Sequence, residues 1–202
     1  MTQMDTQIGK LKQVLAAMGD QARSMVDLGI SVLETRDAAV AEQVIASDLE
    51  LNRFETQLDH MCERRLALQE PFATDFRFIF SAIKTTRDLE RIGDEVKIVA
   101  RWGPKLPGPA SDALVSMAKQ ARAAVAGVVQ AMVALDAEAA EQIIQDDAAI
   151  DRLELEIIQG TESVPEAFIA HALERVGDRA KNIAENIIYA VRGKDVRHLD
   201  DA

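Results

Sequence analysis

A twelve-residue motif that carries two acidic side chains occurs twice in this sequence. The copies are LERIGDEVKIVA at residues 89–100 and LERVGDRAKNIA at residues 173–184. Glu90 and Asp94 in the first copy, like Glu174 and Asp178 in the second, are four positions apart, so each pair shares one face of a helix. Like charges at this spacing repel each other by a few tenths of a kcal/mol. The pattern therefore indicates either a bound cation or a solvated acidic face.

A second set of polar residues precedes each motif at helical spacing. Its members are Asp48, Asn52 and Glu55 in the first half, and Asp147, Asp151 and Glu154 in the second. Each set falls on one face of its segment. If these segments pack against the motif helices, carboxylates from two helices converge on one seam. Unpaired carboxylates are costly to bury, so such a seam needs cations.

Two kinds of cation could balance the seam, and both remain open. Arginines are present at four suitable positions: Arg53, Arg91, Arg152 and Arg175. Metal ions are the other possibility, and a ligand set of carboxylates suits iron, manganese, magnesium or calcium better than a thiolate-type zinc site. No Glu-x-x-His pair of the di-iron oxygenase kind occurs. His171, three positions before Glu174, is either a ligand or, as is commoner, a surface or salt-bridged histidine.

Long helices are predicted to position these residues, and no strand pattern of period two is found. Caps, prolines and glycines predict six of them. They are expected at Asp5–Glu34, Asp37–Gln69, Pro71–Trp102, Ser111–Leu135, Asp136–Gly160 and Pro165–Gly193. Asp37 and Asp136 are the expected N-caps, Pro71 suits a first turn, and Gly193 suits a helix end. The fold class is therefore all-α.

The chain divides into two repeats of three helices. Three of its five prolines lie in the segment GPKLPGPA, so residues 1–102 and 111–202 are predicted as two three-helix bundles with a linker at 103–110. Residues 37–55 and 136–154 align at an offset of 99 with 9 of 19 positions identical. The motifs align at an offset of 84, with 7 of 12 identical, so the second half is 15 residues shorter between these segments. Either two helices are each about two turns shorter, or residues are missing from the sequence.

The third predicted helix also suggests where its acidic pair points. Phe76, Phe80 and Ile83 fall on one side of it and are expected to face the core. Asp94 lies five full turns after Phe76, on the same side. The acidic pair is therefore predicted to continue a core-facing stripe.

The composition excludes several classes of function. A net charge of −11 and a pI of about 4.8 argue against nucleic acid and anionic lipid as partners but allow cations. The single cysteine, Cys62, cannot form an internal disulfide and is predicted to be a small apolar core residue, which fits a reducing compartment. The sequence contains neither a signal-peptide pattern nor an apolar run of membrane-spanning length. We therefore expect a cytoplasmic protein.

At this point the sequence resembles a known family. The pair LERIGD and LERVGD, the segment LALQEPFATDFRFIFSAIKTTRD before the first copy, and the ending IAENIIYAVRGKDVRH are similar to the PhoU family of phosphate-signalling proteins. The resemblance covers nearly the whole chain. It implies two pseudo-symmetric antiparallel three-helix bundles, often assembled as a homodimer.

The resemblance also implies multinuclear metal clusters, of iron or zinc, held by paired acidic motifs. The matching positions in this chain are Glu90, Asp94, Glu174, Asp178, Asp48, Asn52, Asp147 and Asp151. Asn52 departs from the acidic residue expected there and weakens the case for a full cluster in the first half. The shortened second half is the other departure from the family pattern.

The function implied by the resemblance is that of an adaptor. Such a protein reports the state of a phosphate ABC transporter, through its ATPase subunit, to a membrane sensor histidine kinase. It acts as a negative regulator of phosphate uptake and of the phosphate-starvation response, and it meets the membrane only through these partners. No catalytic arrangement is found in the sequence, so the chain is predicted not to be an enzyme. The alternatives are a carboxylate-bridged metalloenzyme, a metal-storage or structural helical protein, and an accessory regulator of another phosphate carrier.

Overall fold

The structure is all-helical, as predicted. The computed structural model describes residues 3–68 and 72–196. Its α-helices are α1 (Gln3–Thr35), α2 (Ala38–Leu68), α3 (Ala73–Trp102), α4 (Asp112–Ala134), α5 (Ala137–Gly160) and α6 (Val164–Arg192). A short 3-10 helix, η1 (Gly103–Lys105), follows α3 within the predicted linker.

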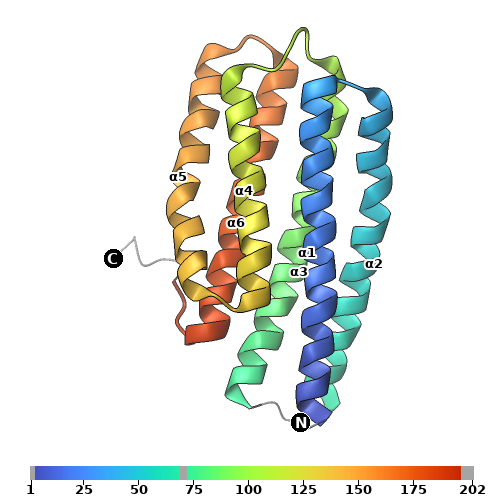
Figure 1. Cartoon of the computed structure of the whole chain (residues 1–202), viewed down its shortest axis with the longest axis vertical. Helices are drawn as coiled ribbons and strands as arrows, with labels where there is room; N and C mark the ends of the chain where they lie inside the picture. The colour runs from blue at the N-terminus through green and yellow to red at the C-terminus, as the bar shows by residue number, and fades with distance from the viewer. Residues whose placement is uncertain (1–2, 69–71, 197–202) are drawn as a thin grey trace.

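The six helices form two antiparallel three-helix bundles that lie side by side along one long axis (Figure 1). Helices α1–α3 make one bundle and α4–α6 the other. The bundles meet along α3 with α6 and along α1 with α4, and the first of these contacts is the more extensive. Both motif helices, α3 and α6, therefore lie at the junction between the two halves.

The helix ends have the local chemistry that the sequence predicts. Asp37 Oδ1 accepts a hydrogen bond from the Ala39 N–H at 2.8 Å, and Asp136 Oδ1 accepts from the Glu138 and Ala139 N–H groups at 3.0 Å. Gly193 ends α6 with a φ of +68°, which a residue without a Cβ adopts freely. The predicted role of Pro71 lies outside the described residues.

The core repeats in the same way as the sequence. Met18 and Ala22 of α1 are fully buried, and so are Met117 and Ala121, which follow them by 99 residues in α4. Fully buried side chains from both bundles form one continuous apolar cluster. Small residues such as Ala22 and Ala121 allow neighbouring helices to approach closely. The two halves are thus held together by a shared core.

The prediction that Phe76 and Phe80 of α3 face the core is wrong. Phe76 and Phe80 are 45% and 39% exposed, whereas Phe78, Ile79 and Ala82 are buried. The Phe76 and Phe80 rings stack on each other with centroids 6.1 Å apart. Helical spacing places Asp94 relative to the phenylalanines correctly, but it does not decide which side of the helix is covered. The acidic pair therefore lies at the edge of the core rather than within it.

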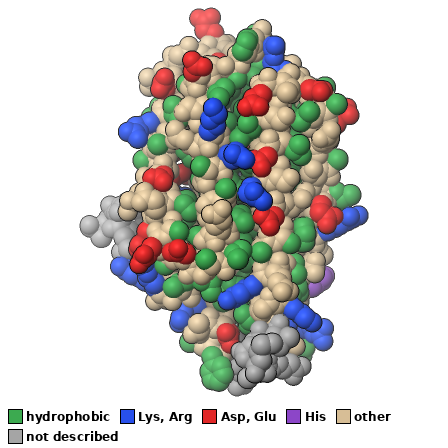
Figure 2. Space-filling view, viewed as in Figure 1, with side chains coloured by type: hydrophobic (Ala, Val, Ile, Leu, Met, Phe, Trp, Pro, Cys, Tyr) green, Lys and Arg blue, Asp and Glu red, His purple; other side chains and the backbone are tan. Residues whose placement is uncertain are grey.

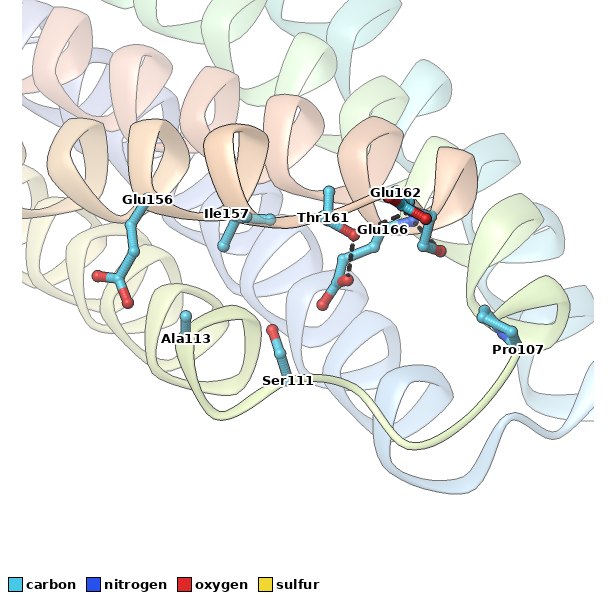
Figure 3. Close-up of a pocket in the computed structure, with 10 residues that line it drawn as sticks. Pro107, Ser111, Ala113, Glu156, Ile157, Thr161, Glu162 and Glu166 are labelled. Carbon is cyan, nitrogen blue, oxygen red and sulfur yellow. Dashed lines mark hydrogen bonds between the residues drawn. The ribbon is translucent and has the colours of Figure 1, made fainter.

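The second bundle is shorter at the α5–α6 connection. Relative to the repeat, α5 ends seven residues early, α6 begins seven residues late, and the connection is one residue shorter. Three residues close it: Thr161 Oγ1 donates to Glu166 Oε2 at 2.7 Å, and Ser163 Oγ accepts from the Glu166 N–H at 3.4 Å (Figure 3). At this connection, each of these helices is about two turns shorter than its counterpart in the first bundle.

Charged side chains of both signs are scattered among apolar and other side chains on the face seen in Figure 2, including the seam between α1 and α4. In this seam, the Arg122 guanidinium binds the Asp27 carboxylate and links the two bundles. Among the described residues, the model contains no helix with the length and apolar character needed to cross a membrane.

Cys62 is a buried core residue, as predicted, with 1% of its surface exposed. Burial raises the pKa of its thiol to about 12, so almost no reactive thiolate exists at neutral pH. We expect the native protein to react with a thiol reagent only after unfolding, which a colour assay with and without denaturant would measure. Rapid labelling of the native chain would contradict this burial.

Candidate functional site

Glycines within the two motifs bring the helix pairs into close contact. A Cβ added to Gly93 of α3 would lie 2.5 Å from Leu51 Cδ2 of α2. A Cβ added to Gly177 of α6 would lie 2.9 Å from Ile150 Cδ1 of α5. Leu51 and Ile150 are equivalent in the repeat. The absence of a side chain at each motif glycine therefore sets the distance between the two helices that carry the acidic residues.

The first acidic cluster, which we define as Asp48, Glu55, Glu90 and Asp94, lies between α2 and α3. Lys97 Nζ is 2.8 Å from Asp48 Oδ2 and 2.7 Å from Asp94 Oδ1, so one ammonium group joins the two helices. Although burial opposes the charge on Lys97, its hydrogen bonds to Asp48 and Asp94 raise its pKa. The predicted convergence of carboxylates from two helices is confirmed in this half.

Asn52 is part of the same seam but contributes no charge. Its Nδ2 donates to Asp48 Oδ2 at 3.3 Å. The amide therefore satisfies a neighbouring carboxylate on its own helix. A second carboxylate at this position would instead repel Asp48.

The second acidic cluster lies between α5 and α6. It consists of Asp147, Asp151, Glu154, Glu174 and Asp178. Lys181 Nζ is 3.1 Å from Asp147 Oδ2, and Asp147 is 4% exposed. Burial and then the charge of Asp178 raise the pKa of Asp151, which places these two carboxylates near each other. The arrangement repeats that of the first half.

His171 distinguishes the second cluster from the first. Its Nδ1 is 2.9 Å from Glu154 Oε1 and 4.0 Å from Glu174 Oε2. One ligand atom from each of these three residues lies within 4.8 Å of the others, close enough to hold one cation. Arg87 occupies the equivalent place in the first half. A guanidinium cannot act as a metal ligand, so the two clusters are chemically different.

The cations that balance the clusters are lysines rather than the arginines considered from the sequence. Arg53 binds Glu50 at 3.1 Å on the exposed side of α2, and Arg175 binds Glu95 of α3 at 3.0 Å. Lys97 and Lys181 were not identified from the sequence. The signal that could have revealed them is their repetition, because each motif copy has a lysine three residues after its aspartate.

Glu90 and Glu174 are the most strongly perturbed carboxyl groups of the two clusters. Burial, followed by the charges of Asp94 and Glu55, raises the pKa of Glu90 to about 7. Burial, followed by the charges of Asp178 and Glu154, raises the pKa of Glu174 to about 7. In the metal-free protein, both groups are therefore partly protonated near neutral pH. A bound cation would favour their ionised forms.

Replacing Glu90 or Glu174 by glutamine is expected to stabilise the metal-free protein at pH 8 and to change its stability little at pH 4.5. A carboxyl group whose pKa is raised on folding stabilises the native state below its unfolded pKa, and this contribution is lost as the pH rises through about 7. After allowance for solvent screening of these part-exposed groups, we expect a gain of about 1 kcal/mol per site at pH 8.

Urea unfolding of the chelator-treated protein at the two pH values measures this difference. Glu42→Gln, at an exposed position of α2 outside both clusters, is the matched control. A constant difference between Glu90→Gln and the unmodified protein at both pH values would contradict the prediction.

The comparison with known proteins agrees with the geometry over both halves. The PhoU domain family matches residues 15–103 and 114–187. The chain belongs to the PhoU family. A relative from Pseudomonas aeruginosa, named as a phosphate-specific transport system accessory protein PhoU homolog, is 34% identical over 214 residues, covering 98% of this chain and 88% of the relative.

Two solved PhoU structures share the fold. The PhoU of Pseudomonas aeruginosa superimposes with a TM-score of 0.86 at 31% identity, covering 95% of this chain and 100% of that one. The phosphate transport system regulatory protein PhoU of Streptococcus pneumoniae gives a TM-score of 0.88 at 29% identity, covering 96% and 99%. PhoU proteins are named as accessory or regulatory proteins, and the prediction that this chain is not an enzyme is confirmed.

Proposed function

We propose that this protein is an accessory regulator of phosphate transport. The observation that carries the proposal is the match of the PhoU family to both halves of the chain, together with relatives that are named as accessory proteins of the phosphate-specific transport system. The fold supports the same role, because six long helices expose extended faces to a partner.

Within this role, the protein acts as a cytoplasmic homodimer that links a phosphate ABC transporter to a sensor histidine kinase. When phosphate is plentiful, it binds the ATPase subunit of the transporter and keeps the kinase in its inactive state. It thereby restrains phosphate uptake and the starvation response. The mechanism needs only different affinities for two conformations of a partner, because a ligand shifts an equilibrium by its differential binding free energy.

Affinity capture tests the regulatory role. The tagged protein is incubated with cytoplasm and solubilised membranes from cells grown in high or low phosphate, and the captured proteins are identified by mass spectrometry. We expect the ATPase subunit and the kinase to be recovered in amounts that change with phosphate. Recovery of neither protein in either condition would refute the proposed adaptor role.

The second acidic cluster also supports a metal-binding role. Glu154, His171 and Glu174 offer two carboxylates and an imidazole, a set that suits iron or zinc and, less well, manganese, magnesium or calcium. The charges of Asp178 and Asp151 act on Glu174, so these carboxylates lie nearby, whereas Asp147 is already bound by Lys181. The first cluster is the weaker candidate, because Lys97 binds Asp48 and Asp94 and Arg87 replaces the histidine.

Metal analysis tests this difference between the halves. Chelator-treated protein is dialysed against Zn²⁺ or Fe²⁺, and the bound metal is measured by mass spectrometry. We expect His171→Ala and Glu174→Gln to lose metal that Glu90→Gln retains. Equal retention by all three variants, or no metal in the unmodified protein, would exclude a centre built on Glu154, His171 and Glu174.

A further inference from the structure

A pocket that the acidic clusters do not use lies between α3 and α6, on the junction of the two bundles. Its volume is about 280 Å³. The residues that line it are Lys84, Arg87, Asp88 and Arg91 of α3, and Asn182, Glu185 and Asn186 of α6. In an acidic protein, three cations within eight residues of one helix face form an unusual local concentration of positive charge.

The two carboxylates in the pocket do not cancel these cations. Asp88 is bound from the far side by Arg179 of α6, whose Nη1 lies 3.6 Å from Asp88 Oδ1. Glu185 has an interaction of its own and offsets one charge. The charge of Arg91 also acts on Asp88, and the charge of Arg87 acts on Glu55 of α2, so three pocket cations face the two pocket carboxylates. The pocket therefore keeps an excess of positive charge.

The repeat explains why this excess exists. Arg175 of α6 binds Glu95 of α3 across the junction at 3.0 Å. At the offset of 84, Arg91 corresponds to Arg175, and Arg179 corresponds to Glu95. The symmetry-related ion pair would thus join Arg91 to Arg179, which are both cations. One side of the junction has the ion pair between Arg175 and Glu95. On the other side, the guanidinium groups of Arg91 and Arg179 share the carboxylate of Asp88.

The donors on this side are also incompletely satisfied. Arg179 Nε is buried and has no hydrogen-bond partner among the described residues. Lys84 Nζ lies 4.5 Å from the centre of the Phe80 ring and 5.9 Å from that of Tyr189, so its ammonium is held by aromatic faces rather than by a carboxylate. Buried donors without acceptors are rare in proteins and indicate that an acceptor is missing.

We propose that this pocket binds a phosphoryl group, either as inorganic phosphate or as the terminal phosphate of a nucleotide. Guanidinium groups bind tetrahedral oxyanions through paired N–H donors, and Arg87 and Arg91 are both exposed at the pocket. The Asn186 side chain offers a neutral donor from the opposite helix, Lys84 adds a point charge, and Asn182 hydrogen-bonds to Asp88 at the same pocket. The site adjoins the first acidic cluster, because Arg87 also acts on Glu55, but no residue of that cluster lines it. Its ligand adds to the proposed function without depending on it.

Isothermal titration calorimetry of the purified full chain with inorganic phosphate, ATP and sulfate tests the proposal. We expect saturable binding of phosphate or ATP that is at least tenfold weaker in the double variant Arg87→Gln/Arg91→Gln. Arg53→Gln, at an exposed position of α2 outside the pocket, is the matched control and is expected to bind like the unmodified protein. Binding of phosphate but not ATP identifies the free anion, and the reverse identifies the nucleotide.

Asp88→Asn is a second test, because its expected result is a gain in affinity, which a misfolded variant would not show. Removal of this carboxylate frees Arg179 and adds one unit of positive charge, so the affinity for the phosphoryl ligand is expected to rise severalfold. The proposal is overturned if neither phosphate nor ATP binds at millimolar concentration, if sulfate binds as tightly as both, or if the arginine double variant binds like the unmodified protein. An unchanged or weaker affinity in folded Asp88→Asn would also overturn it.

Discussion

Replacing Lys181 by alanine is expected to destabilise the metal-free protein by about 3 kcal/mol at pH 8, because breaking a buried ion pair leaves an uncompensated charge. Asp147 is 4% exposed, and Lys181 Nζ at 3.1 Å is its ion-pair partner. The loss is expected to shrink as the pH falls, because burial already raises the pKa of Asp147 and the unpaired carboxylate can take up a proton. Urea unfolding at pH 8 and pH 5 measures both effects.

Lys97→Ala is the natural comparison for this variant. Lys97 occupies the equivalent position, but its partners Asp48 and Asp94 have 16% and 48% of their side-chain surface exposed. Water can therefore replace much of the lost interaction, and we expect a loss of about 1 kcal/mol. In the double variant Asp147→Leu/Lys181→Met, most of the stability should return, because both charges are removed together. Equal losses in Lys181→Ala and Lys97→Ala would show that burial of Asp147 does not decide the effect.

Replacing Gly93 by leucine is expected to destabilise the protein by about 3 kcal/mol, at the upper end of the range for overpacked cores. Even a Cβ at this position would lie 2.5 Å from Leu51 Cδ2 and 3.4 Å from Met25 Cε, and both neighbours are fully buried. A leucine cannot be accommodated unless α3 moves away from α2. Thermal and urea unfolding measure the loss, and crystallography of the variant would show the displacement.

Gly9 provides the control for this substitution. It also lies within a helix, α1, but no atom is within 4 Å of a Cβ added there. Gly9→Ala should therefore stabilise the protein by about 0.5–1 kcal/mol through helix propensity alone. If Gly93→Leu unfolded at the same denaturant concentration as the unmodified chain, close packing at the motif glycine would be refuted.

Local chemistry made most of the fold predictable. Asp136 has a carboxylate that caps a helix, Gly193 adopts a positive φ, and Ser111 accepts from the Leu114 N–H at the start of α4, so the helix ends follow from individual residues. The acidic seams were predictable because spacing within one helix fixes which side chains share a face.

What could not be predicted depends on contacts between helices. Phe76 was expected in the core because it is apolar, yet 45% of its surface is exposed. Lys97 pairs with Asp48, and Arg175 pairs with Glu95 rather than with an acidic cluster. Both ion pairs depend on the distance between two helices and on how each helix is rotated about its axis. A single sequence contains no direct record of these quantities. The metal ligands and the predicted boundaries of the two domains remain predictions.

Because α5 and α6 are shorter where they connect, the two ends of the molecule differ although its two halves are repeats. Two lost turns shorten each of these helices by about 10 Å, whereas the opposite end keeps the full α2–α3 hairpin with Leu68 and Phe72 70% and 83% exposed. The C-terminal end of α2 and the α5–α6 connection lie at opposite ends of the long axis (Figure 1). A partner that recognises the longer tip therefore finds it once per chain, although the acidic motif occurs twice. The two halves are repeats in sequence and fold, but the difference of four helical turns makes the two ends of the molecule unlike.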